Sequence, residues 1–282
     1  MNTPSQEDIL KAINDSGFLF EQEIGFIIEK FEYHIQTNSA FKDLEEEKSR
    51  ELDVTGYKRF YYDEESKISI GIRLLCECKN NKNPFVFITR NKGKIDDSYS
   101  PPNFLFPKDE YLIPVENKQN SFHVKNGFFY YKINEIYPYS ISDKKAVQFC
   151  KLVQKNKKWN AFHDGIYDSI MLPLSKSLEY YKNKDKSIRN ETWKNYIIYF
   201  PIVVLNSKIF SIDSHIDKTK VNEVGYISFT REIDSKKQNN KYLIDFISRD
   251  HLEDYLSKYV NKFAENFKDY VLKETSPDIV LE

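Results

Sequence analysis

An acid and a lysine end the short apolar segment Leu74–Lys79, whose letters are LLCECK. Glu77 and Lys79 are two positions apart, so in a β-strand their side chains point to the same face. A second acid, Asp53, lies 24 residues before Glu77. Carboxylates bind the hard cation Mg²⁺, and a lysine can steady a water molecule or the charge of a transition state. Two acids and a lysine on neighbouring strands are what a Mg²⁺-dependent phosphodiester hydrolase requires.

Three strand-like segments would have to bring these side chains together. The turn at residues 63–66 is short, so the second and third segments are predicted to form an antiparallel hairpin. Asp53 lies 10 residues before this turn and Glu77 lies 11 after it, which places them at similar heights on adjacent strands. The segments cover residues 34–41, 51–62 and 67–79, and the third alternates Ile68, Ile70 and Ile72.

Two helices are predicted before these strands. The first begins with Thr3 as N-cap and Pro4 at the first helical position, and it ends at Gly17 as C-cap. The second covers about residues 18–33 and has one apolar stripe at helical spacing. Glu21 lies at the margin of this stripe, where an acid either reaches solvent or faces a site. The stripe consists of Phe20, Ile24, Ile27, Ile28 and Phe31.

The remaining sequence predicts a mixed sheet flanked by helices. The fold class is α/β in the α+β sense, and residues 1–282 form one elaborated domain. Its core covers about residues 17–90 and 142–273, and an irregular insertion covers about 91–141, with strand-like islands at 111–115 and 127–133. The acidic segment 43–48 predicts a solvated turn without a role in the site. The other expected elements are helices at 142–153, 163–182 (kinked at Pro173) and 250–273, a strand buried on both faces at 196–205, a strand pair at 208–212 and 224–229, and a strand at 242–247.

The composition is typical of a globular protein rather than a disordered or membrane chain, with 40% hydrophobic and 30% charged residues. The apolar runs are too short to cross a bilayer, and the N-terminus lacks a signal-peptide pattern. Three cysteines do not form a paired disulfide set, so we expect a cytoplasmic setting. Zinc would need more ligands than Cys76 and Cys78 supply, so these two are predicted to pack behind the strand.

The net charge of −1 means that affinity for nucleic acid must come from local patches. Two segments without acids carry such patches, residues 79–94 and residues 144–158, and the second contains six lysines. A solvated face would explain either segment. The first begins at Lys79 itself, so we expect its basic residues to lie near a nucleic-acid backbone. They are Lys82, Arg90, Lys92 and Lys94.

The order of a helix with Glu21, a strand with Asp53 and a strand with Glu77-Cys78-Lys79 resembles the restriction-endonuclease-like, or PD-(D/E)xK, nuclease superfamily. The motifs cover about residues 17–79, and the element order extends to the helices and strand near 160–205. The family fold is a helix, a three-strand meander, a further helix and a further strand around a mixed sheet. The sequence departs from the family at Leu52-Asp53, where many members have Pro-Asp.

The resemblance implies a role for each matching residue. Asp53 and Glu77 would ligate Mg²⁺ or Mn²⁺, and the backbone carbonyl of Cys78 would complete the coordination. Lys79 would position or activate the attacking water. Glu21 matches an additional acid that many members carry on this helix. That acid often acts on the metal through a metal-bound water.

The leading hypothesis is therefore a Mg²⁺-dependent nuclease that acts on DNA, in defence against foreign DNA or in DNA repair. Double-stranded DNA is the favoured substrate, although single strands and RNA stay open. The alternative from another class is a non-catalytic module that keeps the fold and binds nucleic acid or protein. A metal-independent enzyme that uses His163, next to Asp164, is a third reading. A homodimer or a partner protein also stays open.

Overall fold

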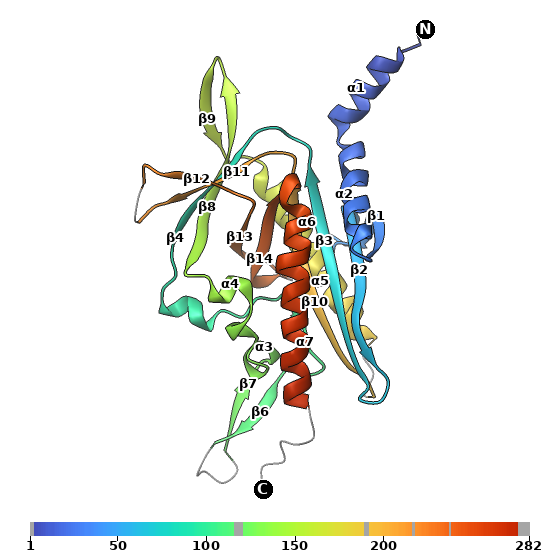
Figure 1. Cartoon of the computed structure of the whole chain (residues 1–282), viewed down its shortest axis with the longest axis vertical. Helices are drawn as coiled ribbons and strands as arrows, with labels where there is room; N and C mark the ends of the chain where they lie inside the picture. The colour runs from blue at the N-terminus through green and yellow to red at the C-terminus, as the bar shows by residue number, and fades with distance from the viewer. Residues whose placement is uncertain (1–2, 116–120, 189–191, 216–217, 237, 276–282) are drawn as a thin grey trace.

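The computed structural model describes residues 3–115, 121–188, 192–215, 218–236 and 238–275. A large mixed β-sheet runs through this part of the chain, and helices flank it (Figure 1). In the described residues the strand order is β1-β2-β3-β10-β14-β13-β8-β4-β11-β12, with β5 beside β10 and β9 beside β8. The strands are β1 (His34–Lys42), β2 (Ser49–Asp63), β3 (Ile68–Lys79), β4 (Phe85–Asn91), β5 (Phe104–Leu105), β8 (Lys144–Lys155), β9 (Lys158–Phe162), β10 (Lys194–Leu205), β11 (Ile209–Asp213), β12 (Val221–Val224), β13 (Tyr226–Asp234) and β14 (Asn239–Ser248).

The helices cover both faces of the sheet. The fold is thus mixed α/β with a mixed sheet flanked by helices, as predicted. Among the described helices, none combines the length and the apolar character that a bilayer crossing requires. The longer helical elements are α1 (Gln6–Ser16), α2 (Phe18–Lys30), a π-helical turn (Tyr167–Met171) that leads into α5 (Leu172–Ser187), and α6 (Leu252–Asp254) continuing through a π-helical segment (Tyr255–Asn261) into α7 (Lys262–Thr275).

The N-terminal helix begins later than predicted and does not bury its apolar side. Ser5, rather than Thr3, is the N-cap of α1, and its hydroxyl accepts a hydrogen bond from the Asp8 amide at 3.2 Å. No residue of α1 is buried. Gly17, at a φ of 90°, ends α1 and starts α2, a conformation that glycine adopts without strain.

The predicted antiparallel meander of β1, β2 and β3 is confirmed. Val54 pairs with Cys76 in the β2–β3 ladder, so continuing this register by one residue sets Asp53 opposite Glu77. The central strand β10 runs parallel to β3 on one side and to β14 on the other. From Ile198 to Leu205 its residues are buried on both faces, as its continuous apolar run predicted.

Two hydrophobic cores fill the two faces of the sheet. The α7 face is covered by α2, α6 and α7, and the α5 face is covered by α5 and the π-helical turn before it. Residues 91–141 are not peripheral to these cores, because six of their aromatic side chains are buried in the core of the α7 face. They are Phe104, Phe106, Phe128, Tyr131, Tyr137 and Tyr139. The expected hairpins there are partly found, as β6 (Tyr111–Pro114) and β7 (Phe122–Lys125), whereas the expected strand at 127–133 is helical, with α3 (Gly127–Tyr130).

The predicted helix at residues 142–153 was wrong, since β8 occupies this segment. Its apolar residues fit a helical stripe, but they pair with β4 on one side, and Phe149 stacks on Phe87 with ring centroids 4.9 Å apart. Tertiary pairing of β-branched and aromatic residues overrides the local pattern here. The strands predicted at 208–212 and 224–229 are confirmed as β11 and β13, but the two are not each other's main partners. Strand β11 pairs with β12 and β4, including Ile209 with Val224, whereas β13 pairs with β14 and β8.

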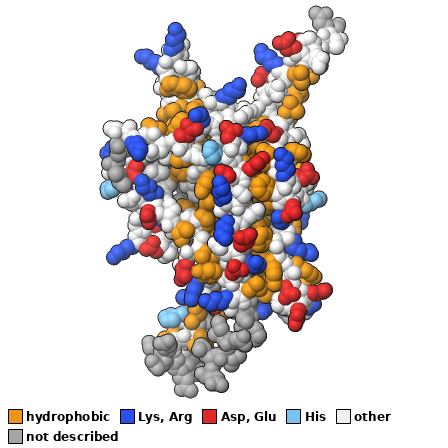
Figure 2. Space-filling view, in the orientation of Figure 1, with side chains coloured by type: hydrophobic (Ala, Val, Ile, Leu, Met, Phe, Trp, Pro, Cys, Tyr) orange, Lys and Arg blue, Asp and Glu red, His pale blue; other side chains and the backbone are white. Residues whose placement is uncertain are grey.

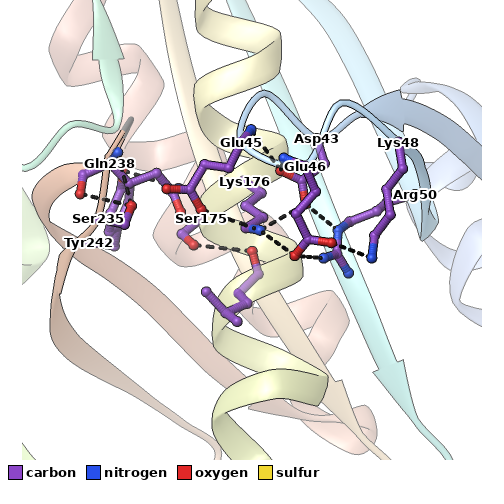
Figure 3. Close-up of polar contacts among 11 residues, drawn as sticks. Asp43, Glu45, Glu46, Lys48, Arg50, Ser175, Lys176, Ser235, Gln238 and Tyr242 are labelled. Atoms are coloured by element: carbon purple, nitrogen blue, oxygen red, sulfur yellow. Dashed lines mark hydrogen bonds and ion pairs between the residues drawn. The ribbon is translucent and has the colours of Figure 1, made fainter.

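The acidic segment 43–48 forms a turn, but its first residue, Asp43, is buried and hydrogen-bonded rather than solvated (Figure 3). The Asp43 carboxylate accepts hydrogen bonds from Lys176 of α5 at 2.8 Å and from Arg50 of β2 at 2.5 Å. Burial alone would raise the pKa of Asp43, but these bonds, with the amides of the turn, hold its pKa below the usual range. This network fastens the β1–β2 hairpin to α5.

Replacing Asp43 should destabilise the fold, because Asp43→Ala leaves the buried Lys176 ammonium with only partial compensation from Glu45 and Glu46. We expect a loss of about 3 kcal/mol in the free energy of unfolding, measured by urea denaturation. The matched control is the exposed pair of Lys208 and Glu223, which has the same 2.8 Å separation. Glu223→Ala should change the free energy by less than about 0.5 kcal/mol. Equal losses in the two variants would contradict the assigned role of burial.

Candidate active site

Asp53 lies at the point of β2 where the strand reverses its two faces and its pairing with β3 ends. Leu52 packs in the core of the α5 face and Val54 in that of the α7 face, although residues two apart in a regular strand share a face. Asn38, at the matching place in β1, has a left-handed φ of 50°. The β2–β3 ladder ends at the pair of Val54 and Cys76, while both strands continue against other neighbours. The two strands therefore open at Asp53.

The Asp53 carboxylate turns toward β3 in this opening. Its Oδ2 atom accepts a hydrogen bond from the Cys78 amide at 2.6 Å. The N–H and C=O of one extended residue point to the same side of a strand. The Cys78 carbonyl therefore also faces Asp53, whereas the next carbonyl, of Lys79, faces β10 and accepts from the Asn206 amide at 3.1 Å.

Glu77 and Lys79 project side by side, as their spacing predicted. The Lys79 ammonium donates to Glu77 Oε2 at 2.7 Å. Glu77 is buried, with 4% of its surface exposed, and the Lys79 side chain is partly exposed. Cys76 and Cys78 point to the α7 core, which confirms their predicted packing role.

Glu21 comes to the same place from the first turn of α2. Its amide donates to the Gly17 carbonyl at 3.1 Å, and a Cβ on Gly17 would lie 3.8 Å from its carboxylate. The side chain is half-buried. Burial and the Asp53 charge both raise the pKa of the Glu21 carboxyl, while the Lys79 charge opposes the rise. Glu21 therefore lies close enough to Asp53 and Lys79 to interact with their charges.

The site holds more negative charge than the protein compensates. Burial raises the pKa of the Glu77 carboxyl to about 7; the Lys79 ammonium opposes this rise and the Asp53 carboxylate adds to it. Burial likewise raises the pKa of Asp53. Burial alone would lower the pKa of Lys79, but Glu77 outweighs it and holds that pKa above the usual value. Three carboxylates thus face one charged lysine.

This donor set fits a hard divalent cation better than a soft metal. It consists of oxygen atoms from Asp53, Glu77 and the Cys78 carbonyl, and a divalent cation would relieve the repulsion between the two carboxylates. In the described part of the chain, no three or more His, Cys, Asp or Glu side chains are arranged to hold a metal ion by themselves. A cation here would depend on two carboxylates and the backbone carbonyl.

The end of β3 is fixed by a residue that the sequence interpretation missed. Asn80 donates from its side chain to the Asn14 carbonyl of α1 at 2.6 Å, and its Oδ1 atom accepts from the Asn206 side chain at 2.7 Å. It therefore joins β3, α1 and the end of β10 behind Lys79. Its position directly after the acid-x-Lys pattern was the only available signal.

The predicted basic residues separate into two groups. Lys82 is exposed in the connection directly after β3. Arg90, Lys92 and Lys94 lie at the other end of β4, roughly 20 Å further along the chain, and Lys92 bonds to the Tyr139 carbonyl. The structure does not bring these three to the carboxylates.

His163 does not form a catalytic arrangement. Its side chain is 84% exposed, and its ring lies 3.8 Å from the similarly exposed Asp164.

Comparisons with protein-family models, curated proteins and solved structures found no match to this chain. The interpretation of the site therefore depends on its own geometry and charge.

The raised pKa of Glu77 predicts a pH-dependent stability. Between about pH 4.5 and 7 the folded state holds a proton on Glu77 that the unfolded state has released, so stability falls as pH rises through this window. The fall should be on the order of 3 kcal/mol. Asp245, whose pKa burial raises to about 6, acts in the same direction but is unaffected by a change at Glu77.

Glu77→Gln should therefore melt at a higher temperature than the wild type at pH 8 without metal, and the difference should vanish near pH 5. Thermal denaturation at both values, in the presence of EDTA, measures this. A variant that is less stable than the wild type at pH 8 would contradict the assigned charge imbalance.

Proposed function

We propose that this protein is a Mg²⁺-dependent nuclease that hydrolyses phosphodiester bonds of DNA, built on a restriction-endonuclease-like core. The element order supports this core. Helix α2 is followed by the antiparallel meander of β1, β2 and β3, and later by α5 and β10, which lies parallel to β3. The intervening strands extend the sheet beyond β14.

The observation that carries the proposal is the meeting of Asp53, Glu77 and the Cys78 backbone at the opening between β2 and β3. The side-chain contact of Asp53 with the Cys78 amide ties the two acid-bearing strands together at 2.6 Å. Glu77 holds Lys79 on the same strand at 2.7 Å. These are the residue types and placements that phosphodiester hydrolysis with a hard cation requires.

Each residue would have a distinct role. Asp53, Glu77 and the Cys78 carbonyl would hold Mg²⁺, which when bound lowers the pKa of water and neutralises charge on the phosphate. Lys79 has a raised pKa and stays protonated at neutral pH, so it would orient water and stabilise phosphate charge rather than accept a proton. Glu21 would position water from the helix side.

The proposed biological role is defence against foreign DNA or DNA repair, with double-stranded DNA as substrate. This part of the proposal follows from the resemblance to the nuclease superfamily. The charge at the site agrees with a DNA substrate that requires a metal ion. The anionic DNA backbone would be repelled by three carboxylates unless a cation lay between them.

The direct test is cleavage of plasmid and of linear DNA by the purified protein, with Mg²⁺ and with EDTA. Asp53→Ala should reduce cleavage to background. Lys79→Ala should reduce the rate roughly 10²- to 10³-fold, because the lysine no longer stabilises the charge on the phosphate. Glu51→Ala is the matched control, since Glu51 is an exposed acid two residues from Asp53 on the same strand. It should keep wild-type activity. Unchanged cleavage in both site variants would show that the site is misassigned.

A metal titration distinguishes the nuclease from a non-catalytic module that keeps the fold. Mg²⁺ or Mn²⁺ at about 100 times its dissociation constant should raise the melting temperature by roughly 5–10 °C, because the cation binds the folded state alone. Asp53→Ala should abolish the rise and Glu51→Ala should keep it. A wild type that shows no rise would favour the non-catalytic module.

A further inference from the structure

The hairpin of β8 and β9 extends beyond the sheet as a free arm. Pairing of β8 with β4 ends at the pair of Lys151 and Phe85, whereas pairing with β9 continues to Lys155 and Lys158. The arm projects roughly 15 Å beyond the last β4 contact. Figure 1 shows that it leaves the molecule at the same end as α1, beyond the C-terminal end of β3 where the candidate site lies.

The structure divides the six lysines of residues 144–158 into two groups. Lys144 and Lys145, at the base, pair with Asp213 at 2.6 Å and with Asp96 at 2.5 Å. Lys151 lies at the last pair with β4, and Lys155, Lys157 and Lys158 belong to the arm beyond it. None of these four lysines forms an ion pair within the described part of the chain. In Figure 2 basic side chains gather at the outer end of this arm.

Two features of the arm oppose folding. Lys155 and Lys158 are direct cross-strand partners, so their like charges repel. At the tip, Asn156 and Lys157 adopt left-handed φ angles of 49° and 64°, and a glycine would be less strained than the lysine. Lys155 lies over the Phe162 ring at 4.7 Å, but within the described residues no acid pairs with Lys155 or Lys158, and an anionic partner would relieve their repulsion.

The opposite face of the arm carries an aromatic group. Trp159 pairs across the strands with Gln154, and its side chain is 57% exposed. An exposed indole on a hairpin that also carries lysines is a common pattern for contact with nucleic acid, where lysines bind phosphates and aromatic rings contact sugars or bases. A two-stranded ribbon also fits the major groove of B-form DNA.

We propose that the β8–β9 hairpin is an arm that binds duplex DNA and holds it across the carboxylate site, a role that depends on the proposed nuclease function. The lysines of the arm contact backbone phosphates, and Trp159, on the opposite face of the ribbon, contacts a sugar or a base. Helix α1, at the same end of the molecule, does not share this role because it has three acids and one lysine, Glu7, Asp8, Asp15 and Lys11.

Binding of a fluorescein-labelled DNA duplex, measured by anisotropy in EDTA, tests the arm without cleavage. The variant Lys155→Ala/Lys157→Gly/Lys158→Ala should bind at least about tenfold more weakly, and the slope of log K against log salt should fall by about 2–3. Lys157→Gly alone should weaken binding while the melting temperature stays equal or rises, since glycine suits the tip. Lys11→Ala, on α1, is the control and should bind as the wild type does.

Trp159 supplies a second readout. The chain has two tryptophans, and Trp193 stacks on Tyr62 at the other end of β3, with ring centroids 4.8 Å apart. Duplex DNA should quench the tryptophan emission of the wild type, and Trp159→Phe should remove the quench. Duplex RNA should bind more weakly, because its major groove is narrow and deep.

Unchanged DNA affinity in the triple variant, or tighter binding of RNA than of DNA, would overturn the proposal. These results are separable from those of the cleavage assay. If the arm is misassigned, Mg²⁺-dependent cleavage persists with unaltered binding in the triple variant. If the nuclease function is misassigned, the loss of binding remains and cleavage is absent.

Discussion

The candidate site depends on the end of pairing between β2 and β3. Up to Val54 and Cys76 the two strands form a regular ladder, and beyond that pair each strand continues with a different neighbour. Backbone groups freed by such a separation need other partners. The Asp53 carboxylate supplies one by accepting from the Cys78 amide, and this contact directs the acid into the opening. A strand pair that stayed closed would leave no room for a cation or a phosphate.

This arrangement has a cost in stability. The protein buries Glu77 almost completely and sets it near Asp53 and Glu21, with Lys79 as the nearby cation. Such charge would be unfavourable in a part of the molecule with only a structural role. The Asp43 network shows the contrast, since there Lys176 and Arg50 satisfy the buried acid and its pKa is lowered. The raised pKa values at Glu77, Asp53 and Glu21 are what a site open to a cation would show.

The sequence predicted the hairpin and its register because strand alternation and a short turn are both local properties. Counting from residues 63–66 was enough to place Asp53 beside Glu77. It did not predict the change of face at Asp53, which accompanies the left-handed conformation of Asn38 and the cores on both faces. The strand β8 was mistaken for a helix because its apolar spacing fits both structures, and only pairing with β4 decides between them.

The roles of charged residues were harder to predict than the strands. The run of lysines at 144–158 looked uniform, yet Lys144 and Lys145 pair with acids that are distant in sequence, whereas the lysines of the arm pair with no acid among the described residues. Likewise, Asp43 looked like a surface acid until α5 supplied Lys176. Ion pairing depends on tertiary contacts, so a charge pattern indicates candidates for a binding surface and the fold selects among them.

The most direct test of the central claim is a crystal structure grown with Mn²⁺, with data collected for the anomalous signal of manganese. We expect an anomalous peak within coordination distance of Asp53, Glu77 and the Cys78 carbonyl, and no such peak in Asp53→Ala crystals grown under the same conditions. An empty position between these groups, in a protein that cleaves DNA with Mn²⁺, would show that the cation binds elsewhere.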